Sequence, residues 1–409
     1  MVKIVLKRSV ADSISRNRGW SLVYGRRKVG KTYMIEHFIE HDVLFTVRPD
    51  LMIKARGFPV EEIDKPGTLI QAITGLLSEG KTVVVDEFQR LPTGLLADIA
   101  RVHPNGRLIL TGSSMRVVSE MTGRNSALLG LLRPFKVGLV SPSDLVSSLA
   151  DTMAPEKLLE SAPILRDPWT VPFYDPDTAL QDLVSMVALT VPGLVGEIFT
   201  EDERELTRTY SSILSMIGAG TTDYREVAST LHGRGVITNG SSANVLPYMK
   251  NLVEMGLLEK VKLYGSKKFT YGIPSLPIRM FYYLDSRYEI TEREVSYTEM
   301  APTSEVLLRA GIEDFIADLL TERIGGRKEL MRTADREVDV LVTLRNRPVL
   351  VGEVKWGRAT RGDVTRFLEK VQDLRCRKVL FSRKPLDTDE VEVLLPSTLV
   401  EEAKGARAP

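Results

Sequence analysis

The sequence is poor in the residues that form disulfides and soft-metal sites. It contains one cysteine, Cys376, and four histidines in 409 residues. A single thiol excludes an internal disulfide, and so few cysteines and histidines give no Cys/His metal cluster. Such cysteine usage is typical of a reducing compartment, so we expect a cytoplasmic protein.

Long apolar runs are also scarce. Met1–Ser9 carries basic residues but no long apolar core, so no signal peptide is expected. The longest uncharged apolar stretch, Leu183–Gly196, is too short to span a bilayer and is interrupted by Pro192 and Gly193. We therefore expect no membrane span and no membrane partner.

Charge is balanced in total but not along the chain. The formal net charge is only +1, which by itself indicates no partner. Arg323–Lys384, however, holds 17 Lys/Arg against 8 Asp/Glu, and the residues after it are acidic. A concentrated positive block is typical of proteins that bind a phosphate backbone, here double-stranded DNA. An ordinary solvated charged surface remains the alternative.

The first 145 residues alternate apolar runs with helical spacing. Trp20–Tyr24, Thr82–Val85 and Leu108–Leu110 are apolar runs bounded by turn residues, whereas Thr32–Glu40 has helical spacing. Strands buried on both faces of a parallel sheet have such continuous apolar runs. Residues 1–145 are therefore predicted to form an α/β domain with a doubly wound, mainly parallel sheet.

The predicted pattern of helices and strands changes twice in the middle of the chain. Residues 146–203 are predicted to be a helical lid or connection. Within Asp177–Phe199, the predicted helix continues up to a break at Pro192-Gly193. Residues 204–285 show the order of a winged-helix domain, three helices and a hairpin. The predicted helices are Tyr210–Ile217, Tyr224–Leu231 and Ser241–Met255, and the strands are Leu257–Leu263 and Lys268–Tyr271, with Lys260, Lys262, Lys267 and Lys268 on the hairpin.

Residues 286–303 are polar and are predicted to be a linker. Residues 304–409 are then predicted to form a small α/β domain. Its elements are a helix over Ser304–Ile324, strands over Glu329–Arg332, Val338–Leu344 and Val349–Lys355, a helix over Gly362–Leu374 and a strand over Lys378–Ser382. The chain length, which suggests two to four domains, agrees with this division.

A phosphate-binding loop follows the first apolar run. Residues 25–32 fit the pattern G-x-x-x-x-G-K-[ST] between a strand and a helix, which is the context that the pattern requires. The glycines let backbone N–H groups point at phosphate oxygens, Lys31 reaches the β- and γ-phosphates, and Thr32 ligates Mg²⁺. The candidate ligands of ATP are Gly25, Arg26, Arg27, Lys28, Val29, Gly30, Lys31 and Thr32.

An acidic pair completes this candidate site. Asp86 ends the apolar run of residues 82–85 and is predicted to hold Mg²⁺, while Glu87 is placed to polarise the attacking water. The alternative is an acidic turn after a strand. Ser113 ends the next apolar run and is predicted to sense the γ-phosphate, with a plain Ser/Gly turn as its alternative.

A second candidate site lies in the C-terminal segment. Glu353 and Lys355 are two residues apart on one predicted strand and so face the same side, and a neighbouring strand can bring Asp339 beside them. Asp339 and Glu353 suit Mg²⁺, Lys355 can offset phosphate charge, and Glu313 is a fourth candidate. The alternative is a set of salt-bridged strand residues. Trp356 has two interpretations, stacking on a base or packing in the core.

These motifs together carry a resemblance. GRRKVGKT, VVVDEFQRL, LILTGSSM and LLRPFKVG resemble the archaeal ATPase family, which belongs to the P-loop proteins of the AAA+ and STAND grouping. GEVKWGRATRGDVTRFLEKV is similar to a domain often fused to that ATPase, which looks like a PD-(D/E)xK nuclease. The resemblance implies ATP hydrolysis with Mg²⁺ and Mg²⁺-dependent cleavage of phosphodiesters by Asp339, Glu353 and Lys355.

The chain departs from the family pattern at two places. The Phe-x-x-Arg-Glu box that usually precedes the first strand is missing from the short N-terminal segment. Leu129-Gly130-Leu131 stands where the family often has Tyr-Gly-Arg, so Arg124 or Arg133 is the candidate replacement for that arginine.

The sequence thus predicts an ATPase coupled to DNA binding and cleavage. One alternative is a nucleotide-dependent switch or DNA-binding regulator that cuts nothing. Another is a replication-initiator-like loader, against which the second candidate Mg²⁺ site argues. The oligomeric state stays open, with a homo-oligomer among the options.

Overall fold

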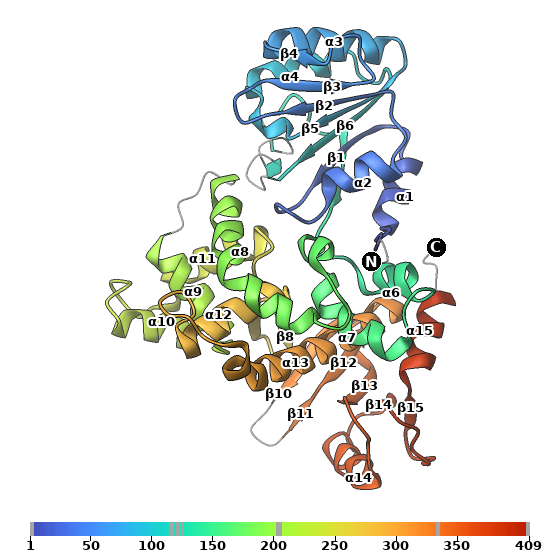
Figure 1. Ribbon diagram of the computed structural model, residues 1–409, viewed down its shortest axis with the longest axis vertical. Coiled ribbons are helices and arrows are strands. Elements are labelled where there is room, and N and C mark those ends of the chain that lie inside the picture. The colour runs from blue at the N-terminus through green and yellow to red at the C-terminus, as the bar shows by residue number, and fades with distance from the viewer. Residues whose placement is uncertain are drawn as a thin grey trace.

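Two β-sheets organise the protein. The computed structural model describes residues 4–113, 118–119, 121, 123–124, 126–201, 207–332 and 336–405. An N-terminal seven-stranded sheet lies at the top of Figure 1, and the helices and the eight-stranded sheet of the remaining chain lie below it.

The N-terminal sheet has the strand order β4-β3-β2-β5-β6-β1-β7. Its five strands from β2 to β7 are parallel, and β3 and β4 add an antiparallel edge. The strands are β1 Trp20–Tyr24, β2 Val43–Val47, β3 Ile53–Arg56, β4 Glu62–Ile63, β5 Thr82–Asp86, β6 Arg107–Gly112 and β7 Leu132–Lys136.

Helices cover both faces of this sheet. Leu22 and Val85 pack on one face with α3 and α4, whereas Val23 and Val84 pack on the other with α1 and α2, because successive side chains of a strand point to opposite faces. The predicted doubly wound α/β sheet is confirmed. Its helices are α1 Ser9–Arg16, α2 Lys31–Phe38, α3 Pro66–Ser78 and α4 Thr93–Ala100, with the short 3₁₀ turn η1 Phe88–Arg90.

A helical segment follows β7. It contains α6 Pro142–Leu149, α7 Pro155–Leu165, the 3₁₀ turn η2 Pro168–Phe173 and α8 Ala179–Glu201. The predicted stop at Pro192-Gly193 is wrong, since α8 runs through Pro192 without interruption. Val187, Val191 and Val195 are fully buried along one side of α8, and this packing outweighs the backbone hydrogen bond lost at the proline.

By length and composition alone, part of α8 could cross a membrane. Ala179–Thr200 is the one such stretch among the described residues, and 44% of its most apolar window is buried within the protein. A buried core helix of a protein without membrane spans has the same properties. The expectation of no membrane span therefore stays a prediction.

The predicted order of three helices and a hairpin is present in residues 207–272. The elements are α9 Arg208–Gly218, α10 Tyr224–Gly233, η3 Ser242–Asn244, α11 Leu246–Glu254, β8 Glu259–Leu263 and β9 Phe269–Gly272. The third helix begins at Leu246, not at Ser241, because Ser241 caps the separate turn η3. The hairpin also does not stand free, since β8 pairs with β10 of the C-terminal sheet.

The predicted linker over residues 286–303 is wrong at both ends. Helix α12 extends over Leu276–Tyr288, and α13 begins at Tyr297 and continues to Ile324. Ser296 caps α13 by accepting a hydrogen bond from the Glu299 N–H. Only residues 289–296 connect the two helices, because the cap starts α13 seven residues earlier than the apolar spacing indicates.

The C-terminal sheet has the order β15-β14-β13-β12-β10-β8-β9, with β11 paired to β10. The long helix α13 packs on one face and α14 on the other. The elements are β10 Arg327–Arg332, β11 Glu337–Val338, β12 Val340–Leu344, β13 Arg347–Lys355, α14 Arg361–Lys370, β14 Arg377–Ser382, β15 Glu392–Leu394 and α15 Pro396–Gly405.

One buried apolar cluster runs from Val140 to Ala403. It includes Val187 of the helical segment, Ile213 of α9 and Phe315 of α13, together with residues of the C-terminal sheet. The predicted boundaries near residues 203 and 285 therefore divide the sequence but do not divide this core.

Replacing Gly218 by alanine tests the packing of α9 against α12. A Cβ at this position would lie 2.3 Å from the Cβ of Tyr282, so the helices must separate. We expect Gly218→Ala to lower the free energy of unfolding by about 1–3 kcal/mol in urea titrations. Gly233→Ala in α10 is the control, because its Cβ would meet nothing within 4 Å. Equal stability of the two variants would contradict this packing.

Candidate functional site

The phosphate loop has the backbone that its glycines predict. It leaves β1 at Tyr24 and enters α2 at Lys31. Gly30 has φ +84°, in the left-handed region that glycine tolerates. A Cβ at Gly25 would lie 1.8 Å from the carbonyl oxygen of Val137, so only glycine allows residue 137, which follows β7, to pass this closely. Val29 is fully buried and anchors the loop.

Lys31 lies over this loop. Its ammonium group donates hydrogen bonds to the carbonyl oxygens of Gly25, at 2.8 Å, and Arg26, at 3.1 Å. The side chain is buried and begins the first turn of α2, whose free N–H groups favour anions. The cation and the helix end therefore act at the same point, as a phosphate site requires.

Asp86 and Thr32 are in direct contact. The Thr32 hydroxyl donates to Asp86 Oδ2 at 2.8 Å, and the Thr111 hydroxyl donates to Asp86 Oδ1 at 3.0 Å. Asp86 is buried at the end of β5. Hydroxyl and carboxylate oxygens are ligands that Mg²⁺ prefers, so the donors present here fit this ion.

Glu87 is held in one orientation by three side chains. Its carboxylate accepts hydrogen bonds from Gln89, at 2.6 Å, and Ser113, at 3.3 Å, and lies 3.5 Å from Arg90. Glu87 also has φ +58°, which is uncommon and strained for a residue other than glycine. Ser113 thus lies at the site, as a partner of Glu87. The contacts made by Gln89 and Arg90 were not predicted, although both follow closely in the same sequence run.

The two arginines of the loop have acidic partners. Arg26 pairs with Asp167 at 2.5 Å, and Arg27 pairs with Glu197 of α8 at 2.6 Å. Both side chains were predicted to bind nucleotide together with the rest of the loop. The structure joins both to the helical segment, and Arg27 and the exposed Lys28 also line the cleft. Their role in nucleotide binding stays a prediction.

The loop opens into a cleft of about 1650 Å³. Lys31, Thr32, Asp86 and Glu87 line it on one side. The lining also contains apolar and aromatic side chains from η2 and the residue after it, from α8 and from the N-terminal segment: Ile4, Leu6, Trp169, Phe173, Tyr174, Met186 and Leu194. Phosphate-binding and apolar groups in one cleft match the two parts of a nucleotide.

The N-terminal segment contributes more than its sequence predicts. Although the family box is missing, Arg8 lines the cleft and donates a hydrogen bond to the Gly138 carbonyl oxygen at 2.9 Å. Burial lowers the pKa of the Arg8 guanidinium to about 10, although Asp144 and Asp167 act in the opposite direction. Neither predicted replacement arginine lines the cleft: Arg124 is exposed, and Arg133 packs over the ring of Phe135.

The second candidate site is also brought together. Val340 of β12 pairs with Gly352 of β13, so Asp339 lies beside Glu353. Asp339 accepts a hydrogen bond from the Val354 N–H at 2.7 Å, and the Lys355 ammonium donates to Glu353 at 2.9 Å. Glu313 faces this group from α13, and burial, together with Asp339 and Asp314, raises the pKa of its carboxyl to about 7.

Lys370 joins this group from the end of α14. Its ammonium lies 3.3 and 3.4 Å from the two carboxylate oxygens of Glu353. No periodic signal in the sequence links the two residues. Among the described residues, no three Asp, Glu, His or Cys side chains are arranged to hold a metal ion. Glu353 forms ion pairs with two lysines, Lys355 and Lys370. The oxygen donors suit Mg²⁺, but this arrangement is that of a salt-bridge network.

Trp356 packs at the edge of the core. Its ring stacks on Phe381 with an interplanar angle of 4°, and the Arg383 guanidinium lies 5.1 Å from its centroid. These contacts favour core packing, the second of the two interpretations of this residue.

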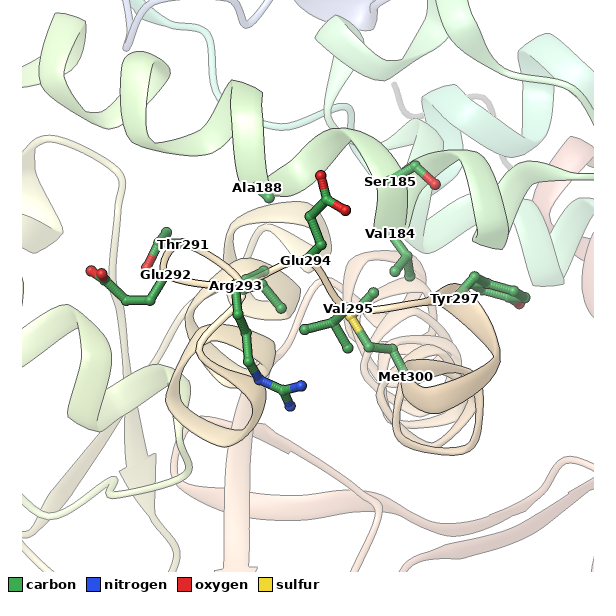
Figure 2. A pocket seen from close by; sticks show the side chains of 11 residues that line it. Val184, Ser185, Ala188, Thr291, Glu292, Arg293, Glu294, Val295, Tyr297 and Met300 are labelled. Atoms are coloured by element: carbon green, nitrogen blue, oxygen red, sulfur yellow. The ribbon is translucent and has the colours of Figure 1, made fainter.

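A smaller cleft of about 580 Å³ lies between α8 and the connection from α12 to α13. Figure 2 shows Val184, Ser185 and Ala188 of α8 facing Glu294 and Val295. Arg293, the basic residue in the lining of this cleft, forms an ion pair with Glu299 at 3.1 Å. Nothing in this lining matches the arrangement of a catalytic site.

The N-terminal α/β sheet and its phosphate loop are similar to those of an AAA domain. Residues 17–135 match a protein family described as the AAA domain, which is less than half of the chain. The sequence matches no curated protein.

Two archaeal proteins are among the solved structures to which the chain is similar. A Walker-type ATPase of Pyrococcus abyssi is 18% identical, with a TM-score of 0.51, over 68% of this chain and 96% of that one. The ORC2 protein of Aeropyrum pernix is 14% identical, with a TM-score of 0.42, over 71% and 97% of the two chains. At these identities, the first likeness shows the fold alone.

The raised pKa of Glu313 predicts a pH-dependent effect of Glu313→Gln. Below about pH 4 the carboxyl is protonated in both the folded and unfolded states, so the variant and the wild type should differ little. Between about pH 4 and 7 the unfolded state ionises first, so the wild type should progressively lose stability relative to the variant.

Urea unfolding at pH 4, 6 and 8 in EDTA measures this difference. Glu305→Gln, at an exposed site on the same helix, is the control and should show no such trend. A difference for Glu313→Gln that stays constant across this pH range would contradict the burial of Glu313 against Asp339.

Proposed function

We propose that the protein binds and hydrolyses ATP in the cleft at the phosphate loop. The observation that carries this proposal is the convergence of Lys31, the Thr32–Asp86 pair and the clamped Glu87 on one side of the cleft. Thr32 and Asp86 would hold Mg²⁺, which supplies charge neutralisation for the phosphates. Lys31 would exchange its loop carbonyls for phosphate oxygens, and Glu87 would orient and polarise water.

We further propose that the C-terminal part binds double-stranded DNA. Arg361 and Arg366 of α14 have highly exposed side chains, so their ion pairs with Asp387 and Asp363 are screened by solvent and can be exchanged for phosphate contacts. The partly exposed Lys355 and Lys370 both pair with Glu353. Lysine and arginine side chains that neutralise phosphates supply most non-specific affinity for DNA. The hairpin contributes less than its four lysines indicate, because Lys262 pairs with Glu329 and Lys260 lies over Phe269.

The acidic group on β13 supports a second activity, Mg²⁺-dependent cleavage of phosphodiesters. For Asp339 and Glu353 to hold the ion, Lys355 and Lys370 would have to release Glu353, and Lys355 would then offset the charge that develops on the phosphate. Glu313 would orient a water molecule beside them.

A nucleotide-dependent switch or DNA-binding regulator without cleavage is the second candidate. The observation that favours it is the neutralisation of Glu353 by both Lys355 and Lys370. The cytoplasmic location and a homo-oligomeric state remain proposals.

Lys31→Ala and Glu87→Gln separate binding from hydrolysis. Lys31→Ala should abolish binding of Mg·ATP, because the loop loses its phosphate cation. Glu87→Gln should retain binding but lower kcat about 10²–10⁴-fold, because the amide cannot act as a base. Calorimetry and phosphate release measure the two effects, with the exposed Lys54→Ala as the control. Hydrolysis that survives in Lys31→Ala would exclude this site as the ATPase.

Asp339→Asn tests the second activity. The wild type should nick supercoiled plasmid in Mg²⁺ and ATP but not in EDTA, and Asp339→Asn should lose nicking while retaining DNA binding. Asp373→Asn is the matched control, since Asp373 pairs with Arg336 outside the acidic group. Nicking that persists in Asp339→Asn would refute the assignment, and DNA binding without nicking in the wild type would support the regulator.

A further inference from the structure

A buried ion pair joins the phosphate loop to the rest of the chain. Arg26 directly follows Gly25 of the loop, and its guanidinium lies 2.5 Å from Asp167 Oδ2. Asp167 is 0% exposed and Arg26 is 6% exposed, and Arg26 does not line the cleft. A loop residue with its charge buried in this way cannot move without moving its partner or leaving a buried charge unpaired.

The same carboxylate oxygen also binds helix α12. The Ser275 hydroxyl donates to Asp167 Oδ2 at 2.7 Å, and Ser275 is the N-cap of α12. Pro168, the residue after Asp167, lies close to Gly30 at the other end of the loop, since a Cβ at Gly30 would be 3.6 Å from the Cβ of Pro168. Asp167 therefore contacts the phosphate loop and the first turn of α12 at once.

The residue before Asp167 extends these contacts to α13. Arg166 binds Asp318 at 2.7 Å, and Asp318 binds the buried Lys328 of β10 at 2.6 Å. Arg279 of α12 binds Asp314 of α13, also at 2.7 Å. Glu313, which faces the second acidic group, is the neighbour of Asp314 on α13. Ion pairs, hydrogen bonds and the peptide bonds between neighbouring residues thus connect the loop to α12 and α13.

We propose that Asp167 is a positioning residue that transmits the nucleotide state of the phosphate loop to α12 and α13. The inference rests on the proposed binding of ATP. The Lys31 ammonium donates a hydrogen bond to the Arg26 carbonyl oxygen. Phosphate oxygens of a bound nucleotide would compete with this carbonyl for the ammonium. Nucleotide therefore changes the bonding of the Arg26 peptide while its side chain stays anchored on Asp167. Linkage requires that α12 influences nucleotide affinity in return.

Hydrogen exchange with and without Mg·ATP tests this coupling on the full-length protein. In the wild type, nucleotide should change the exchange of amides in residues 276–288 and 297–324. Asp167→Asn keeps the shape of the side chain but removes its charge. It should abolish this nucleotide-dependent change and raise the KM for ATP on the order of tenfold, with a smaller change in kcat, because the loop loses its anchor.

Two further variants separate coupling from general damage. Glu197→Gln breaks the other ion pair of the loop, which is partly exposed, and should leave the exchange response of α12 intact. Ser275→Ala removes the α12 contact but keeps the Arg26–Asp167 pair. It should lose the response of α12 to nucleotide and, by linkage, change ATP affinity less than Asp167→Asn does, because the loop keeps its anchor.

The outcomes distinguish this inference from the proposed function. Wild-type protein that binds ATP with no change of exchange in α12 or α13 would overturn the inference and leave the ATPase assignment intact. An unchanged response in Asp167→Asn would also overturn it. Wild-type protein that binds no Mg·ATP would overturn both.

Discussion

The backbone of residues 25–30 is the constraint on which the candidate ATP site depends. Its first residue passes within contact of the Val137 carbonyl, and its last turns left-handed to start α2. The first condition excludes any side chain at Gly25, whereas the second makes a side chain at Gly30 strained. This turn places the Lys31 ammonium and the N-terminus of α2 at one point. The buried strands β1 and β5 then bring Thr32 to Asp86.

Sequence pattern predicted the parts of the site that local chemistry determines. The loop, the acidic end of β5 and Ser113 follow from motifs whose spacing is fixed by a strand and a turn. The partners of Arg26 and Arg27 did not follow, because Asp167 and Glu197 are 141 and 170 residues away and approach only through tertiary packing. The apolar lining of the cleft, from Ile4 to Leu194, was missed for the same reason.

The same distinction holds for the C-terminal part. The i, i+2 spacing of Glu353 and Lys355 and the antiparallel pairing of β12 with β13 made the acidic group predictable. Lys370 reaches it from a helix, at a position that no period indicates. The linker prediction failed because polar composition was taken as absence of structure, whereas Ser296 caps a helix of 28 residues that is polar on its exposed side.

The hairpin β8–β9 forms hydrogen bonds with β10 and so belongs to the same sheet as the acidic group. Cutting the chain between α12 and α13 would leave β8 and β10 each with an unpaired row of N–H and C=O groups. Open edges of this kind recruit strands from other molecules. The part of the chain that begins with α13 is thus poorly suited to expression as an isolated fragment.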